Sequence, residues 1–161
     1  MTEKLVKNSV VVITSGYFNP IHRGHVECIN LSKKLFPKTH LVVIVNNDKQ
    51  VMLKKGYTFI PMEDRVSIVE NLRVVDEVFR SVDEDASVIR SIEALAKKYS
   101  GYRIVFAKGG DRNIGNIPER EVCEKYNIEI ISGVGDKIES SSALMKNMDD
   151  YVQRVLAQKR S

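Results

Sequence analysis

The sequence predicts one α/β domain of the doubly wound type, with helices on both faces of a five-stranded parallel sheet. Short apolar runs alternate along the chain with segments of helical periodicity, the pattern of successive strand–helix–strand units. Because these runs are rich in β-branched residues and lack polar alternation, we expect strands covered on both faces. The chain has 161 residues, the usual size of one domain, so the predicted domain spans 1–161.

The first part of the chain predicts a strand, a helix and a second strand. The runs 10–14 and 41–45 are almost entirely valine, isoleucine and leucine, as expected for buried strands. Residues 22–36 place apolar side chains at helical spacing, and Pro37 ends that helix. This is a βαβ unit, and we expect its crossover to be right-handed.

The middle of the chain predicts a loop, a helix, a short strand and another helix. Residues 46–60 are polar and rich in lysine, so we expect a mobile loop. Pro61 suits the first turn of a helix that runs to about residue 73. A strand is predicted at 77–80, and the apolar spacing over 86–99 predicts the next helix.

The last part of the chain predicts two more strands and two helices. The run 103–107 is the fourth strand, and a helix over 118–127 leads to the fifth strand at 128–131. The last helix begins near 140–142 and repeats apolar side chains along one side. The order of the elements predicts an open, Rossmann-like sheet.

Composition excludes several kinds of protein. The chain has 25 lysines and arginines against 21 acidic residues, a net charge of +4, and its basic residues occur in scattered pairs. This pattern favours small anionic ligands over nucleic acid. The longest apolar runs fall far short of the ~20 residues that span a bilayer, so we expect no membrane segment.

The cysteines and the first residues indicate the cell compartment. Cys28 and Cys123 lie far apart, and neither has the neighbouring Cys or His of a zinc site. We therefore expect two reduced thiols on two helices, and no metal site built by the protein itself. The charged start of the chain lacks the apolar core of a secretory signal, which predicts a cytoplasmic protein.

The predicted topology places the ligand site at two loops. Doubly wound sheets bind ligands beyond the carboxyl ends of their strands, where the strand order reverses, here at 15–25 and 108–112. Gly16 lets the backbone approach a ligand. His22 and His25 project from one face of a helix start, a position that favours phosphate oxygens.

Two further segments follow the same reasoning. Lys108, Gly109, Gly110 and Asp111 come directly after the fourth strand, and two adjacent glycines allow a backbone close to a flat base. The serines 140–142 open the last helix, where hydroxyl groups and free amides cap the helix and bind phosphate equally well.

These segments together resemble a known family. The loop Gly16 to His25 resembles the H-x-G-H signature of the nucleotidyltransferase superfamily that includes the cytidylyltransferases, whose members usually read G-x-F-D-P-x-H-x-G-H. The resemblance is strongest to the subgroup that handles glycerol 3-phosphate and heptose 1-phosphate. Further matches occur, in order, at 43–48, 54–56, 63–65, 75–78, 108–111 and 140–142.

The resemblance implies roles for individual residues. It implies that His22 and His25 stabilise the phosphates of a nucleoside triphosphate, and that Lys54 or Lys55 reaches the same phosphates, although a solvated lysine pair is an alternative. For Arg65 a purely structural role is likewise an alternative. The implied nucleotide-binding residues are Gly16, Tyr17, Phe18, Asn19, Gly24, Arg65, Lys108, Gly109, Gly110, Asp111, Ser140, Ser141 and Ser142.

Three departures from the family pattern bear on the acceptor and on activity. Asn19 stands where most members carry Asp, although the nicotinamide mononucleotide adenylyltransferases also have Asn there. Ser142 replaces a frequent Thr. Lys137 stands where the glycerol-phosphate enzymes place an arginine, and we expect it to bind the acceptor, with a solvated loop lysine as the alternative.

The sequence thus predicts an enzyme that transfers a nucleoside monophosphate from CTP to a sugar phosphate or polyol phosphate, with Mg²⁺ arriving on the triphosphate. Two alternatives stay open: an ATP-dependent adenylyltransferase acting on a mononucleotide or sugar phosphate, and a non-catalytic nucleotide-binding module. The expected partners are the nucleotide and a phosphorylated acceptor, without nucleic acid or membrane. The oligomeric state is left open, and a homodimer is compatible with the sequence.

Overall fold

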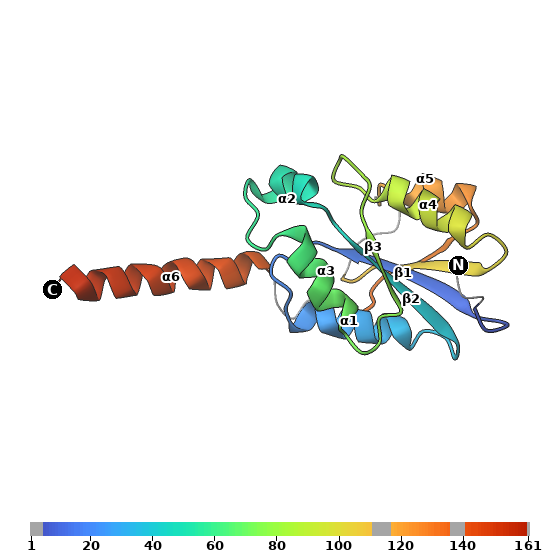
Figure 1. Ribbon diagram of the computed structural model, residues 1–161, viewed down its shortest axis with the longest axis horizontal. Coiled ribbons are helices and arrows are strands. Elements are labelled where there is room, and N and C mark those ends of the chain that lie inside the picture. The colour runs from blue at the N-terminus through green and yellow to red at the C-terminus, as the bar shows by residue number, and fades with distance from the viewer. Residues whose placement is uncertain (1–4, 111–116, 136–140, 161) are drawn as a thin grey trace.

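A computed structural model describes residues 5–110, 117–135 and 141–160 of the chain (Figure 1). Its strands form one five-stranded sheet in the order β3-β2-β1-β4-β5, and every pair is parallel. This confirms the predicted fold class. The strands are β1 (Val10–Gly16), β2 (Thr39–Val45), β3 (Glu77–Arg80), β4 (Arg103–Ala107) and β5 (Glu129–Ile131).

Helices cover both faces of the sheet. The described helices are α1 (Arg23–Lys33), α2 (Asp48–Lys55), α3 (Met62–Glu70), α4 (Ile89–Lys98), α5 (Arg120–Lys125) and α6 (Ser141–Arg160). The alternating side chains of β1 enter two apolar cores: Val11 and Ile13 pack with residues of α4 and α5, and Val10 and Val12 pack with residues of α1 and α3. The prediction of buried strands at 10–14 and 41–45 is therefore correct, whereas the edge strands β3 and β5 are only partly buried.

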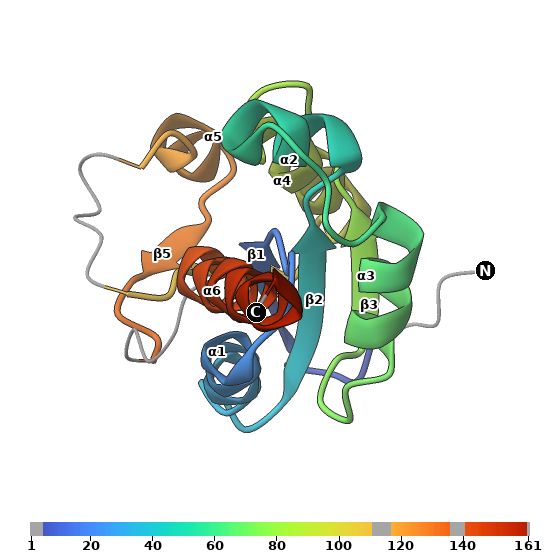
Figure 2. The ribbon, with the colours of Figure 1, turned by 90° about the vertical axis from the view of Figure 1, so that its left-hand side faces the viewer.

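The strand order creates the expected reversal point. From β1 the chain builds outward through β2 and β3, and it then crosses back to add β4 on the other side of β1. The carboxyl ends of β1 and β4 are therefore neighbours, and the loops that follow them face the same edge of the sheet (Figure 2).

One predicted element is wrong. Residues 46–60 are not all loop, because α2 occupies Asp48–Lys55. Its first turn is capped reciprocally, since Asn47 Oδ1 accepts from the Gln50 N–H and Gln50 Oε1 accepts from the Asn47 N–H. Gly56, with φ of 78°, ends the helix in the left-handed conformation that glycine tolerates. The capping signal outweighs the weak helical periodicity of the segment.

The four helices predicted over 22–36, 61–73, 86–99 and 118–127 are present but shorter. The first one begins at Arg23 because His22 is its N-cap, and it ends at Lys33. The helix predicted over 86–99 begins only at Ile89, since residues 83–87 form a turn in which Asp83 accepts from the backbone of Arg90 and Ser91. The helix predicted over 118–127 covers Arg120–Lys125.

The last helix, α6, does not pack along the sheet as helices such as α1 and α3 do. α6 leaves the body near the site edge and extends away from it (Figures 1 and 2). Across the described parts of the chain, no helix is both long enough and apolar enough to cross a membrane.

Candidate functional site

The loop after β1 has a compact shape set by an aromatic ring. Phe18 is 3% exposed and folds back beneath Gly16, so that a Cβ atom on Gly16 would lie 2.6 Å from Phe18 Cζ. The same ring meets His25 edge-on, with centroids 5.0 Å apart. Gly16 and Phe18 therefore act together to fix the loop and to support the His25 ring.

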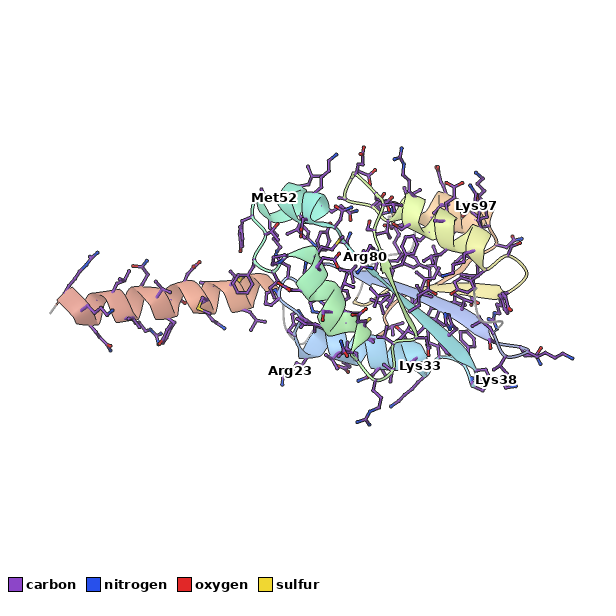
Figure 3. All side chains as sticks on the ribbon, viewed as in Figure 1. Arg23, Lys33, Lys38, Met52, Arg80 and Lys97 are labelled. Atoms are coloured by element: carbon purple, nitrogen blue, oxygen red, sulfur yellow. The ribbon has the colours of Figure 1, made fainter. Side chains whose placement is uncertain are left out.

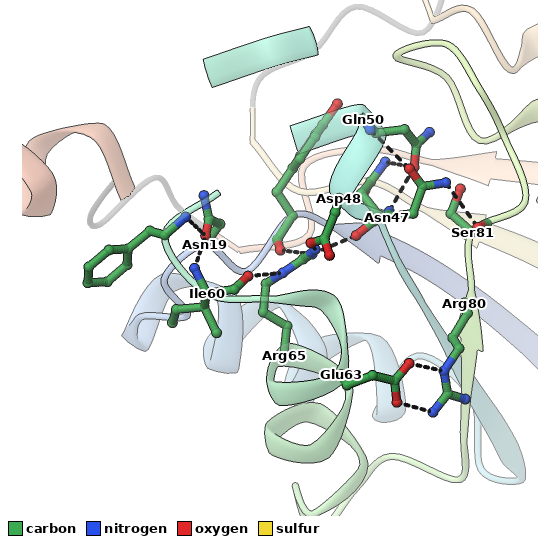
Figure 4. A network of polar contacts seen from close by, with 12 residues as sticks. Asn19, Asn47, Asp48, Gln50, Ile60, Glu63, Arg65, Arg80 and Ser81 are labelled. Carbon is green, nitrogen blue, oxygen red and sulfur yellow. Dashed lines mark hydrogen bonds and ion pairs between the residues drawn. The ribbon is translucent and has the colours of Figure 1, made fainter. Parts of the chain in front are cut away.

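Asn19 ties this loop to the segment before α3. Its Oδ1 accepts hydrogen bonds from the backbone N–H groups of Phe59 (3.1 Å) and Ile60 (2.7 Å) (Figure 4). The Asn19 side chain is buried. Both hydrogen bonds use the Oδ1 atom of Asn19 as the acceptor, and a carboxylate oxygen of Asp at this position could accept them in the same way.

Arg65 lies beneath the site rather than in it. Its side chain has no exposed surface, and it donates to the carbonyl oxygens of Tyr17 (2.7 Å), Asn46 (2.5 Å) and Ile60 (2.8 Å) and to Asp48 Oδ1 (2.8 Å). A single guanidinium thus joins the ends of β1 and β2 to the start of α3 (Figure 4). The structure places Arg65 in the supporting role that the sequence left as an alternative to nucleotide binding.

The two histidines form a stacked pair at the start of α1. Their ring centroids are 3.8 Å apart, with an interplanar angle of 27°. The His22 N–H donates to His25 Nδ1 and the Gly24 N–H donates to His22 Nδ1, each at 3.1 Å. Because both Nδ1 atoms accept, each neutral ring carries its proton on Nε2. The pair therefore presents two N–H donors, and Gly24 contributes through its backbone.

The charge state of His25 follows from its surroundings. Burial, the neighbouring His22 and the nearby Lys54 charge lower the pKa of His25 to about 4. At neutral pH its ring is therefore uncharged in the absence of a ligand. An anion bound beside the ring would raise the pKa of His25, because it opposes the repulsion from His22 and Lys54.

Of the two lysines that the sequence left open, Lys54 reaches the site loop. Its Nζ lies 4.2 Å from the centroid of the Tyr17 ring, and its charge acts on His25. Adjacent residues of a helix point about 100° apart, so Lys54 and Lys55 cannot both face the loop in the same way. The geometry assigns Tyr17 to the support of this lysine.

The loop after β4 lies against α1. The Lys108 N–H donates to the Ile131 carbonyl, and the Lys108 carbonyl accepts from the Val134 N–H. A Cβ atom on Gly109 would lie 3.2 Å from Cys28 Sγ, and Gly110 has φ of 73°. A side chain at Gly109 would crowd the Cys28 sulfur, and Gly110 adopts the left-handed conformation that favours glycine.

The remaining predicted site residues are described incompletely or not at all. Asp111, Lys137 and Ser140 lie outside the described residues. α6 begins at Ser141, as the sequence predicts within a residue, and only the backbone is described at Ser141 and Ser142.

The sequence of residues 13–156 matches the model of the family described as cytidylyltransferase-like. The chain belongs to this family. The match covers both described loops of the site and most of α6, in agreement with the resemblance carried by the H-x-G-H loop.

Relatives of this cytidylyltransferase-like chain have names that indicate different substrates. Choline-phosphate cytidylyltransferase A of Rattus norvegicus is 38% identical over 72 residues, which are 45% of this chain and 20% of that protein. Bifunctional protein HldE of Hahella chejuensis is 32% identical over 122 residues, which are 74% of this chain and 24% of that protein. FAD synthase of Pyrococcus horikoshii is 40% identical over 68 residues, which are 42% of this chain and 45% of that protein.

The chain spans only a fifth to less than half of the length of these relatives. A solved structure has a similar fold: the lipopolysaccharide core biosynthesis protein from Thermoplasma volcanium aligns with a TM-score of 0.61 and 21% identity, over 78% of this chain and 97% of that chain. At this identity the likeness shows the fold alone.

One group of residues in the cytidylyltransferase-like site was missed at the sequence level. Gln50 has no exposed surface, and its Nε2 donates to the carbonyls of Asp85 (2.8 Å) and Ser87 (2.7 Å). Asn47 Nδ2 donates to the carbonyls of Ser81 and Asp83. These bonds anchor α2, and with it Lys54, on the loop after β3. The spacing Asn47-x-x-Gln50 was the available signal.

Proposed function

We propose that the chain is a nucleotidyltransferase that transfers a nucleoside monophosphate from CTP to a sugar phosphate or polyol phosphate and releases pyrophosphate. The observation that carries the proposal is the stacked pair of His22 and His25, whose Nε2–H groups are set by backbone hydrogen bonds at the start of α1. Membership of the cytidylyltransferase-like family supports the same reaction class.

The proposed reaction needs charge stabilisation rather than a covalent intermediate. An oxygen of the acceptor phosphate attacks the α-phosphorus of the nucleotide and forms a new P–O bond. The bond from the α-phosphorus to the bridging oxygen breaks, and that oxygen leaves with the electron pair as part of pyrophosphate. We assign His22, His25 and Lys54 to the negative charge that grows on the non-bridging and leaving oxygens.

Neither cysteine is suited to nucleophilic catalysis. Cys28 and Cys123 are free thiols, and burial raises the pKa of both, that of Cys123 to about 12. Free thiols also support the expectation that the protein works in the cytoplasm, which we keep as part of this proposal.

The metal in this proposal arrives with the nucleotide. Mg²⁺ on the triphosphate would neutralise part of its charge, held mainly by phosphate oxygens. In the described ranges, no three His, Cys, Asp or Glu side chains gather where they could hold a metal ion. The histidines and Lys54 suit phosphate oxygens rather than a cation.

The remaining assignments extend this site. We propose that the backbone of Lys108, Gly109 and Gly110, together with Asp111, contacts the base, because the loop after β4 lies next to that after β1. The start of α6, at Ser140, Ser141 and Ser142, would bind phosphate. Lys137 would bind the acceptor.

A second candidate is an adenylyltransferase that uses ATP. It is favoured by the range of relatives, which includes an FAD synthase, and by Asn19, because the nicotinamide mononucleotide adenylyltransferases also carry Asn at this position. A non-catalytic nucleotide-binding module is the alternative from another class. The oriented histidine pair argues against it, because binding alone does not need both donors.

The test is a thermal-shift screen of nucleoside triphosphates with Mg²⁺, followed by a pyrophosphate-release assay over phosphorylated acceptors. At ~100 times its dissociation constant a ligand adds about 2.7 kcal/mol of stability, which is readily measured. CTP with a polyol phosphate should give turnover, and His25→Ala should lower it at least about hundredfold, whereas the loss of the capping hydrogen bond from the His22 N–H should lower the stability by only about 0.5–2 kcal/mol. His40→Gln, on the far end of β2, is the control.

Three results would contradict these assignments in different ways. Turnover with ATP alone would replace the CTP assignment. A thermal shift without pyrophosphate release from any acceptor would favour the binding module. The absence of any nucleotide-induced shift would remove the proposal of a nucleotide site.

A further inference from the structure

α6 carries an apolar stripe along one side. The stripe is formed by side chains spaced three or four apart, namely Leu144, Met145, Met148, Tyr151, Val152, Val155 and Leu156. Those in its middle and outer part are strongly exposed: Met148 is 49%, Tyr151 64%, Val152 43% and Leu156 43% exposed. Figure 3 shows the side chains of this helix standing clear of the body.

A surface of this kind indicates a partner. The four strongly exposed residues offer on the order of 400 Å² of mostly apolar surface in one strip, the size of the largest and often functional patch on a monomer. Helix α6 has 20 residues and so a length of about 30 Å. Because it leaves the body at its first turns, its own chain provides little packing for the stripe (Figure 1).

The spacing of the stripe is symmetric about residue 150. Counting outward from this residue, Met148 matches Val152, Met145 matches Val155, and Leu144 matches Leu156. Six of the seven stripe residues therefore map onto one another when the helix is reversed about its centre. An antiparallel pair of these helices, with its two-fold axis at residue 150, would therefore set apolar side chains opposite apolar side chains, and the same patch would serve both subunits.

We propose that α6 is a dimerisation element, and that two copies of the chain pack their α6 helices antiparallel with the two-fold axis near residue 150. In this register Met148 lies opposite the partner's Val152, Met145 opposite the partner's Val155, and Leu144 opposite the partner's Leu156. Covering both stripes removes on the order of 800 Å² of apolar surface, and the flanking polar groups bring the contact near the ~1,200 Å² lower limit of specific interfaces.

Charge favours the antiparallel over the parallel arrangement. Turning about 100° per residue places Lys159 on the same line as the centre of the stripe. A parallel pair would bring the two Lys159 side chains together in the seam, where like charges repel. The antiparallel register instead separates the two Lys159 side chains by most of the length of the helix pair, and the two antiparallel helix dipoles attract one another.

The first experiment measures the oligomeric state of the full chain by sedimentation velocity over a range of concentrations. We expect a dimer, and Val152→Asp, which sets a carboxylate against the partner's Met148, should raise the dimer dissociation constant at least about tenfold. The matched control is Ala157→Asp, the same charge change at an exposed residue about 180° around the helix from Met148, which should leave the constant unchanged. Circular dichroism of each variant checks that helix content is retained.

The second experiment tests the register on nearly native chains. Met148→Cys and Val152→Cys chains are oxidised separately and as a mixture. The antiparallel register brings residue 148 of one copy within disulfide distance of residue 152 of the other, so the mixture should cross-link more than either chain alone. Cross-linking of Val152→Cys alone, without gain in the mixture, would mean a parallel pair and would overturn the proposal.

Three further results would overturn the proposal that α6 is a dimerisation element. A chain that is monomeric throughout, or a dimer that Val152→Asp leaves intact, would overturn the proposal. So would a monomer that binds vesicles of anionic lipid through the same stripe, since the occupant would then be a membrane surface. None of these results bears on turnover, so the proposed reaction stands or falls separately.

Discussion

The imidazole rings of His22 and His25 stack 3.8 Å apart, and each is held by a hydrogen bond from the first turn of the same helix. One short segment thus provides the N-cap of α1 and the orientation of two phosphate donors. The arrangement exists before any ligand binds, so little reorganisation is needed when charge develops on a bound phosphate.

The charge state of His25 gives the first prediction. In the ligand-free protein its ring should titrate near the pKa of about 4 caused by burial, His22 and Lys54, and not near 6.5. Since the folded-state pKa is lowered, this group should add to the free energy of unfolding above pH 6.5, and that contribution is lost as the pH falls toward 4. NMR of the ring protons over this pH range measures the titration.

Pyrophosphate provides the internal control for that titration. A bound anion should raise the pKa of His25, because it opposes the repulsion from Lys54. A ring that titrates near 6.5 in the free protein, or that ignores added pyrophosphate, would contradict the assigned geometry.

The lysine pair gives the second prediction. Lys54→Ala should raise the KM for the nucleotide and lower kcat, at least about tenfold in kcat/KM, because Lys54 lies over Tyr17 beside the histidines. Lys55→Ala removes the same charge one position along α2 and serves as the matched control. Steady-state kinetics at fixed ionic strength measure both. Equal losses of kcat/KM in the two variants would mean that the net charge of α2, rather than the position of Lys54, affects catalysis.

The strands could be predicted because their signal is local. Runs such as Val10 to Ile13 are apolar on both faces, and the pattern identifies a central strand without knowledge of its neighbours. The helix N-terminus at His22 could also be predicted from spacing. In contrast α2 was missed, because it depends on the reciprocal cap of Asn47 and Gln50 in a segment of weak periodicity.

Arg65 shows why the site could be predicted only in part. Its helical spacing with apolar residues was visible in the sequence, but its partners are carbonyls of Tyr17, Asn46 and Ile60, which only the fold brings together. The same holds for the choice between Lys54 and Lys55, which depends on the direction of a single helix turn. Roles that depend on contacts distant in sequence need the structure.

The contact of Gly16 with Phe18 gives the third prediction. In Gly16→Ala the new Cβ atom would lie 2.6 Å from Phe18 Cζ, so the ring must move, at a cost of about 1–3 kcal/mol in the free energy of unfolding. Activity should fall as well, because the same ring supports His25. Chemical denaturation and turnover measure the two effects.

A double variant identifies the cause. If the clash is with the ring, Gly16→Ala should cost less in a Phe18→Leu background than alone, because the smaller side chain leaves room. Additive costs would show that the backbone at Gly16, rather than Phe18, rejects the methyl group.

The last prediction concerns Glu77, at the start of β3 and outside the site. Lys98 Nζ lies 2.5 Å from one of its oxygens, and the other is close to His40 Nε2 (3.3 Å) and to the Tyr99 hydroxyl. Burial of Glu77 disfavours its charge, but these hydrogen bonds outweigh burial and lower the pKa from 4.5 to about 2. The carboxylate therefore joins β2, β3 and the end of α4.

Glu77→Gln should lower the free energy of unfolding by about 2–3 kcal/mol at neutral pH, because the side chain is only 19% exposed and its charge is stabilised in the fold. A lowered pKa contributes stability above the unfolded value of 4.5, and that stability is lost as the pH falls toward 2. The difference in the free energy of unfolding between native protein and variant should therefore be constant above about pH 5 and shrink below it.

Glu129→Gln, which removes the 54% exposed partner of Arg103, is the control and should cost less than about 0.5 kcal/mol. Denaturant titrations from pH 3 to pH 7 measure both, and a Glu77→Gln cost that does not change with pH would show that the charge of Glu77 contributes nothing to stability.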